Sequence, residues 1–122
     1  MTRPPEFRAG KNIAMKVPEH EYLRTAAFYR DVLRFEETGT NPPEEVESTC
    51  FRFGEMTLWI DRVPGLSQAE LWLEVRTSDV AAASRYLAGK DCARRDEIEP
   101  LPDSIDGFWL ANPANVIHLV TK

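Results

Sequence analysis

The sequence predicts an α+β fold built from two tandem modules, each with the order strand, helix, strand, strand, strand. Apolar and polar residues alternate in several short segments, which is typical of half-buried strands. Two other segments carry apolar residues at helical spacing. The second half of the chain repeats the order of the first, because one constant shift places Val75 on Val17 and Tyr86 on Phe28. Such a repeat indicates that each half needs its neighbour to bury a face.

Length and composition are those of a small globular protein. The chain has 122 residues, of which 43% are hydrophobic and 29% charged, and its formal net charge is -5. Negative charge argues against a nucleic-acid partner or a membrane surface, and no apolar run approaches the roughly 20 residues that span a bilayer. The N-terminus lacks the apolar core of a signal peptide, so we expect a cytoplasmic protein. Cys50 and Cys92 form no Cys-x-x-Cys motif and are expected to be free thiols.

Module one is expected over about residues 11–62, after a loose N-terminal tail at residues 1–10. Prolines and paired acids make residues 39–45 an exposed loop, and Gly54-Glu55 joins the last two strands. The elements expected from the periodicity are a strand at 12–17, a helix at 21–33 and strands at 35–38, 48–53 and 56–62.

Module two is expected over about residues 69–121, after a linker at residues 63–68. Thr77 or Ser78 can cap its helix, Asp79 suits the first turn, and Gly89 suits the end. The elements expected are a strand at 70–76, a helix at 80–88, a weak strand at 91–98 and strands at 105–111 and 116–120.

The last two strands are joined by Asn112-Pro113-Ala114-Asn115, which is turn chemistry. After this turn, Ile117 and Leu119 share one face of the final strand, and Val116, His118 and Val120 share the other. A single imidazole therefore lies among apolar neighbours. It is either a neutral, hydrogen-bonded histidine or a metal ligand or general base.

Together these features resemble the vicinal oxygen chelate superfamily, which includes glyoxalase I, extradiol dioxygenases and bleomycin-resistance proteins. The resemblance covers roughly residues 11–121 and rests on residues 12–17, 27–33, 51–54 and 112–117. It implies that two βαβββ modules form one glyoxalase-like domain with a cup-shaped mixed sheet, and that the protein is a homodimer. It is weak evidence for any one activity, because function lies in the site and not in the fold.

In members of this superfamily that use a metal, four inward side chains from the first and last strands of each module bind a divalent ion. Here the last strands offer Asp61 and His118, both acceptable ligands. The first strand of module one offers Asn12 or, in another register, Ala14. The first strand of module two offers Trp72 or Glu70, depending on the register. Asp61, Glu70 and His118 are thus the candidate ligands for zinc, nickel, manganese or iron, although no cofactor is firmly implied.

All three tryptophans, Trp59, Trp72 and Trp109, fall on expected strands. An aromatic cup with a few fixed charges would suit a flat or cationic organic molecule, which it would hold by stacking and cation–π contacts. Glu74 and Arg76 would orient polar groups of this ligand. Alternatively, the tryptophans plug the cup or form a subunit interface. Glu70 and Glu74 would then be a solvated edge.

The leading hypothesis is a glyoxalase/bleomycin resistance-type protein that binds a small molecule and has a degenerate metal centre. The second hypothesis is a metal-dependent lyase, isomerase or dioxygenase that uses Asp61, Glu70 and His118. The third is an interaction module whose cup is filled by its own side chains. The register of residues 70–76 discriminates the first two, because Glu70 must point toward the metal for the enzyme hypothesis to hold.

Overall fold

The computed structural model describes residues 3–41 and 46–122, which form two compact units. The first unit is Lys11–Trp72, and the second unit combines Leu73–Lys122 with the chain up to Gly10. The unit boundaries differ from the expected module boundaries, because the start of the chain belongs with the second unit. The expected tail also contains structure, since the first strand begins at Arg8 and the Phe7 and Tyr86 rings lie 6.1 Å apart.

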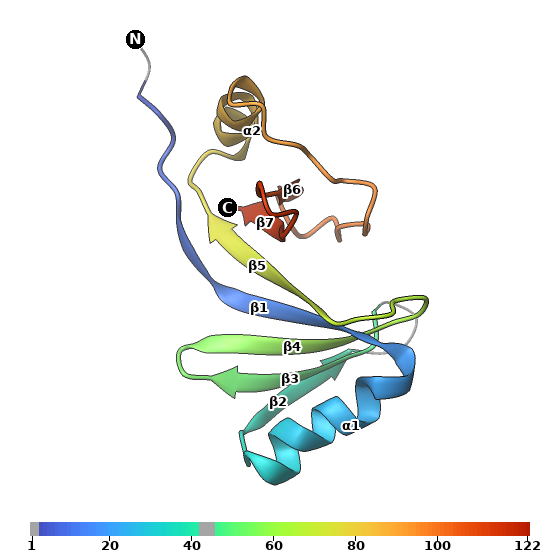
Figure 1. The fold of residues 1–122 in the computed structure, drawn as a ribbon. Coiled ribbons are helices and arrows are strands. Elements are labelled where there is room, and N and C mark those ends of the chain that lie inside the picture. The colour runs from blue at the N-terminus through green and yellow to red at the C-terminus, as the bar shows by residue number, and fades with distance from the viewer. Residues whose placement is uncertain (1–2, 42–45) are drawn as a thin grey trace. The chain divides into compact units, whose positions relative to one another are not determined.

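The order of elements follows the expected repeat in most respects (Figure 1). The first seven elements are β1 (Arg8–Pro18), the 3-10 helix η1 (Glu19–Glu21), α1 (Tyr22–Ala27), the π-helix η2 (Phe28–Val32), β2 (Glu37–Asn41), β3 (Ser48–Phe53) and β4 (Met56–Val63). The remaining elements are β5 (Glu70–Arg76), α2 (Val80–Gly89), β6 (Gly107–Ala111) and β7 (Ile117–Thr121). No helix among the described residues is long and apolar enough to cross a membrane.

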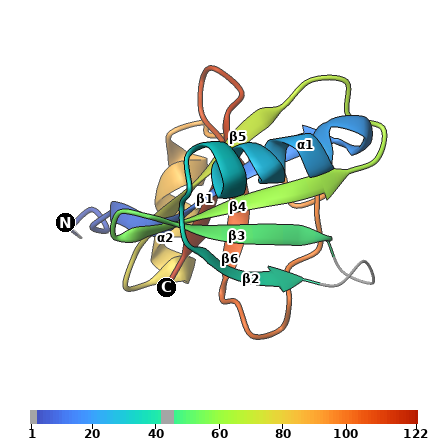
Figure 2. The ribbon, with the colours of Figure 1, turned by 90° about the horizontal axis from the view of Figure 1, so that it is seen from below.

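In the first unit the strands lie in the order β2-β3-β4-β1. β4 runs parallel to β1, while β3 runs antiparallel to both β2 and β4. Figure 2 shows α1 lying across this sheet. The apolar residues of the alternating strands lie on the covered face, where they form the core with a tyrosine from α1: Val17, Tyr22, Phe51, Leu58 and Ile60.

Two expectations for the first unit need correction. The helix expected at 21–33 is present as three consecutive helical pieces, but Leu23, Val32 and Leu33 are exposed and do not reach the core. The strand expected at 35–38 lies later, at Glu37–Asn41, and so takes residues 39–41 from the expected loop. The rest of that loop, residues 42–45, lies outside the described residues.

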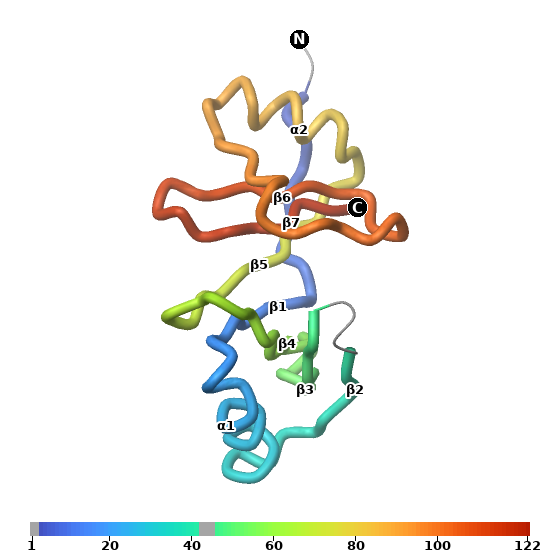
Figure 3. The backbone as a smooth tube through the Cα atoms, turned by 90° about the vertical axis from the view of Figure 1, so that its right-hand side faces the viewer, coloured from blue at the N-terminus to red at the C-terminus, as the bar shows by residue number. Residues whose placement is uncertain are grey.

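In the second unit β5 pairs in parallel with β7, and β6 pairs antiparallel with β7. Figure 3 shows α2 lying over β6 and β7. The core cluster joins α2 to these strands through Ala83, Phe108, Leu110 and Val120. The weak strand expected at 91–98 is reduced to an isolated bridge between Arg94 and Leu110. A charged run has low strand propensity, which accounts for this.

Candidate functional site

Strand register places the polar residues of the first unit on one face of its sheet. Lys16 is paired with Asp61 across β1 and β4, and Ser48 is paired with Asp61 across β3 and β4. Directly paired residues point to the same side of a sheet. These three side chains therefore share the face opposite to the apolar core under α1, as the alternation predicts.

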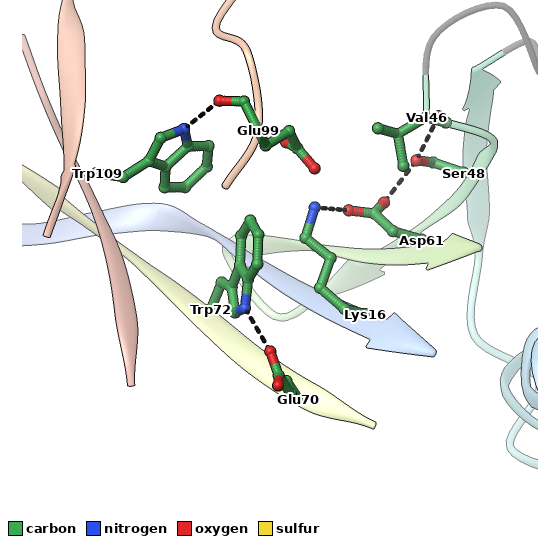
Figure 4. Close-up of polar contacts among 8 residues, drawn as sticks. All are labelled: Lys16, Val46, Ser48, Asp61, Glu70, Trp72, Glu99 and Trp109. Atoms are coloured by element: carbon green, nitrogen blue, oxygen red, sulfur yellow. Dashed lines mark hydrogen bonds and ion pairs between the residues drawn. The ribbon is translucent and has the colours of Figure 1, made fainter. Parts of the chain in front are cut away.

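A buried ion pair lies at the centre of this polar face (Figure 4). Lys16 Nζ donates to Asp61 Oδ2 at 2.7 Å, and the two side chains are only 3% and 7% exposed. Ser48 Oγ donates to Asp61 Oδ1 at 2.5 Å and also lies 3.1 Å from the carbonyl oxygen of Val46. Both oxygens of the carboxylate are thus satisfied by protein donors, as a buried charge requires.

The other two candidate metal ligands of this unit, Asn12 and Glu70, each accept a hydrogen bond from an indole N–H group. Trp59 Nε1 donates to Asn12 Oδ1 at 2.8 Å, and Trp72 Nε1 donates to Glu70 Oε2 at 3.1 Å. The ammonium of Lys16 lies 4.1 Å from the ring centroid of Trp72, which is the geometry of a cation–π contact. Trp72 is half-buried and Glu70 is exposed, so the edge of the polar face that β5 forms is accessible to solvent.

The donor set of the first unit does not fit a divalent metal. Asn12, Asp61 and Glu70 each accept a hydrogen bond from an indole or an ammonium group. Lys16 supplies a positive charge directly at Asp61, where a metal cation would have to bind, and like charges repel. Across residues 3–41 and 46–122, no three His, Cys, Asp or Glu side chains are gathered closely enough to hold a metal ion.

In the second unit, Trp109 and Glu74 share one face of the sheet, because both are in register with Leu119. Trp109 is buried, and its Nε1 donates to the carbonyl oxygen of Glu99 at 2.8 Å. Arg76 Nε lies 3.2 Å from Glu74 Oε1, and Arg76 also donates to the carbonyl oxygen of Lys122. The Glu74 side chain is 8% exposed and that of Arg76 is 37% exposed.

His118 lies on the other face of the second unit. Its register partners are Leu73 and Leu110, and Leu110 belongs to the core cluster under α2. Its Nδ1 lies 3.0 Å from the carbonyl oxygen of Val116, the residue just before β7. Sequence reasoning placed His118 on an inward face together with Trp109, whereas the register separates them. This position supports the hydrogen-bonded histidine among the alternatives.

Sequence reasoning identified most of the polar face but missed Ser48 and the indole partners. Lys16 alternates in phase with Asn12 along the first strand, and this alternation places both residues on the same face. Ser48 begins its strand, and nothing in its own segment marks it as a partner of Asp61. Only the antiparallel register of β3 and β4 brings these two residues together.

No family model matches the sequence, and no curated protein matches it either. The fold, in contrast, matches solved structures. A glyoxalase/bleomycin resistance protein/dioxygenase superfamily member from Vibrio splendidus 12B01 is 13% identical, with a TM-score of 0.60, and the match covers 95% of this chain and 98% of that one. Methylmalonyl-CoA epimerase from Mycobacterium tuberculosis is 12% identical, with a TM-score of 0.68 and coverages of 99% and 91%.

A third match is the Mn(II)-bound glyoxalase from Novosphingobium aromaticivorans, which is 16% identical with a TM-score of 0.69. The match covers 96% of this chain but 39% of the glyoxalase, so the chain spans about two fifths of that protein. These likenesses confirm the expected α+β fold of the glyoxalase/bleomycin resistance/dioxygenase type. At such low identity they concern the fold alone.

Proposed function

We propose that this chain is a small-molecule binding protein of the glyoxalase/bleomycin resistance type, with a degenerate metal centre. It holds a flat organic molecule at the edge of the polar face, against Trp72 and Trp59. One observation carries the proposal. The oxygen acceptors at the candidate ligand positions, Asn12, Asp61 and Glu70, are bonded to indole and ammonium groups. Side-chain oxygens that already accept these hydrogen bonds are better suited to a site for an organic molecule than to coordination of a metal ion.

Charge indicates which ligands the site prefers. Lys16 and Asp61 neutralise each other inside the face, so Glu70 is the carboxylate that remains at its exposed edge. The Lys16 ammonium at the Trp72 ring is compensated by Asp61, so the charge that a ligand meets beside this ring is the Glu70 carboxylate. A flat organic cation is therefore the expected ligand. In the second unit, Trp109, Glu74 and Arg76 remain candidate ligand contacts.

The first experiment measures tryptophan fluorescence while the purified protein is titrated with proflavine, a flat cation, and with anthraquinone-2-sulfonate, a flat anion. The cation is expected to bind more tightly. Glu70→Gln should lower the affinity for proflavine selectively, and Trp72→Ala should lower it further. Glu55→Gln neutralises an exposed carboxylate in the turn between β3 and β4, outside the proposed site, and serves as the matched control. Equal affinity for the two probes in the wild-type protein would contradict the charge argument.

The second experiment measures metal content by elemental mass spectrometry after dialysis against manganese, zinc, nickel and iron. The proposal expects no stoichiometric metal, and it expects proflavine binding to be unchanged after treatment with EDTA. Nearly one metal per chain, lost in Asp61→Ala but retained in the control Glu74→Ala, would overturn it. That result would favour a metal-dependent lyase, isomerase or dioxygenase instead.

A further inference from the structure

The polar face of the first unit presents apolar groups to a ligand, although an ion pair lies at its centre. Lys16 and Asp61 are buried, whereas Ala14, Trp59 and Trp72 remain partly exposed. Ala14 and Trp59 belong to this face because β1 and β4 pair them in register, two residues before the paired Lys16 and Asp61. A molecule that approaches the face therefore contacts a methyl group and two indoles before it reaches the ion pair.

Ala14 lies between the two indoles. In β1 the same face carries Asn12, Ala14 and Lys16, each about 7 Å from the next along the strand. Trp59 reaches toward the start of this row, where its Nε1 donates to Asn12 Oδ1. Trp72 contacts the other end of the row, where Lys16 Nζ lies 4.1 Å from its ring centroid. The two indoles thus flank Ala14, which contributes only a methyl group between them.

The contacts of Trp72 indicate how a ligand would lie against it. Lys16 covers one face of the ring, and Figure 4 shows the ring on the side of Lys16 that is nearer to the start of β1. The opposite face of the ring therefore looks back along β1 toward Ala14. Trp72 Nε1 also donates to Glu70 Oε2 at 3.1 Å, which holds a carboxylate at the edge of the ring. A cation stacked on the Ala14 side would have this carboxylate beside it.

We propose that Ala14 is the specificity-determining residue of this ligand site, because the ligand ring lies over its methyl group between Trp59 and Trp72. The inference rests on the proposed function and narrows the ligand class to planar aromatic cations. A planar ring can contact one indole with each of its two faces. A tetrahedral alkylammonium ion is bound best where aromatic faces surround it, and two flanking indoles do not surround it.

The small side chain of residue 14 leaves room for the ligand ring. Its neighbours on this face of β1 are held in place, because Asn12 accepts a hydrogen bond from Trp59 and Lys16 donates one to Asp61. Neither neighbour can move aside without losing its bond. A larger residue 14 would therefore compete with the ligand for the same contacts, and the affinity for a flat ligand should fall as this side chain grows.

The test measures the binding of proflavine and of tetraethylammonium, a tetrahedral cation, by isothermal titration calorimetry. Wild-type protein should bind tetraethylammonium about tenfold more weakly than proflavine, or more weakly still. Ala14→Leu should raise the dissociation constant of proflavine by about tenfold, with smaller increases in Ala14→Val and the smallest in Ala14→Ser. Ala9→Leu introduces the same side chain at an exposed alanine on the other face of β1, and this matched control should bind as the wild type does.

Urea denaturation of each variant shows whether a lost affinity reflects unfolding, and the valine and serine variants keep the test decisive if Ala14→Leu does not fold. Wild-type affinity for proflavine in both Ala14→Leu and Ala14→Val would overturn this inference and leave the proposed function intact. Equal affinity of the wild-type protein for the two cations would likewise overturn the restriction to planar ligands. A wild-type protein that binds neither cation would overturn both this inference and the proposed function.

Discussion

Both units bury an acidic side chain beside a basic one, but they do so in different ways. In the first unit, Asp61 and Lys16 are 7% and 3% exposed, so both charges have left the solvent. In the second unit, Glu74 is 8% exposed, while its partner Arg76 is 37% exposed and keeps contact with water. A fully buried pair depends on each member for compensation of its charge, whereas an exposed partner can be solvated alone. The polar face of the first unit is thus the more sensitive region.

The largest expected effect follows from breaking the first pair. Asp61→Ala leaves the Lys16 ammonium buried without its carboxylate and should lower the free energy of unfolding by about 3–5 kcal/mol. Loss of the ion pair in Glu74→Ala should lower it by about 1 kcal/mol or less, because Arg76 remains solvated. Urea denaturation of both variants measures the difference.

A double variant tests whether the uncompensated buried charge is what lowers the stability of Asp61→Ala. Lys16→Met together with Asp61→Asn removes both charges at once and should recover much of the stability that Asp61→Ala loses, because no uncompensated charge stays buried. If the double variant is as unstable as Asp61→Ala, the loss comes from packing or from the Ser48 hydrogen bond instead.

The two units also differ in the space around a strand glycine. At Gly10, in the second unit, an added Cβ would lie 2.5 Å from Glu74 Cγ and 2.8 Å from Glu74 Cβ, so the strand or the side chain must move. Gly10→Ala should therefore cost about 1–3 kcal/mol of unfolding free energy. Gly39, on β2 of the first unit, has nothing within 4 Å of an added Cβ. Gly39→Ala should be neutral or slightly stabilising in the same urea titration, and an equal loss at both positions would contradict the close approach.

The fold was largely predictable because alternation is sharp where one face of a strand is covered. In residues 12–17, Ile13, Met15 and Val17 alternate with smaller or polar residues, and the structure has a strand there in which Val17 lies in the core and Ile13 and Met15 pack against it. The position of β2 was missed because Glu37–Asn41 is exposed throughout most of its length and carries no apolar signal. Its pairing with β3 defines it instead.

The candidate site was predictable in part, and Asp61 and His118 show why. Asp61 lies in a strand where polar and apolar faces contrast, so its face could be assigned from the sequence. His118 lies in a strand with apolar residues on both faces, and alternation alone does not say which face a helix covers. The register with Leu110 decides that His118 lies on the α2 side. Hydrogen-bond partners distant in sequence, such as Asn12 and Trp59, are likewise set by register.

The helices of the two units also begin differently. Asp79 Oδ1 accepts a hydrogen bond from Ala82 N at 3.0 Å at the start of α2, whereas Glu21 makes no side-chain capping bond at the start of α1. Asp79→Ala should lower the free energy of unfolding by about 1 kcal/mol. Glu21→Ala should change it by much less in the same urea titration. Equal effects would mean that the α2 cap contributes nothing beyond an ordinary surface charge.

The two cysteine thiols are expected to react at different rates with an alkylating reagent. At neutral pH this difference has no expected effect on the stability of the protein. Burial raises the pKa of the Cys50 thiol to about 11, and the negative charges of Asp61 and Glu37 add to this shift. Cys92, in the second unit, is only half-buried. Because the thiolate is the nucleophile, iodoacetamide at pH 8 should label Cys92 long before Cys50 in the folded protein. Mass spectrometry of tryptic peptides measures the two rates, and the labelling in urea, where both thiols are exposed, is the control.

The same shift predicts how stability depends on high pH. The pKa of Cys50 is higher in the folded chain than in the unfolded chain, so the folded state holds this proton when the unfolded state has released it. Stability is therefore unaffected below the ordinary thiol pKa and falls as the pH rises toward about 11. Burial raises the pKa of Tyr22 as well, so the wild-type protein alone does not isolate the thiol. Cys50→Ala should reduce the fall in urea midpoint between pH 8 and pH 10, and an unchanged fall would assign it to Tyr22 and other groups.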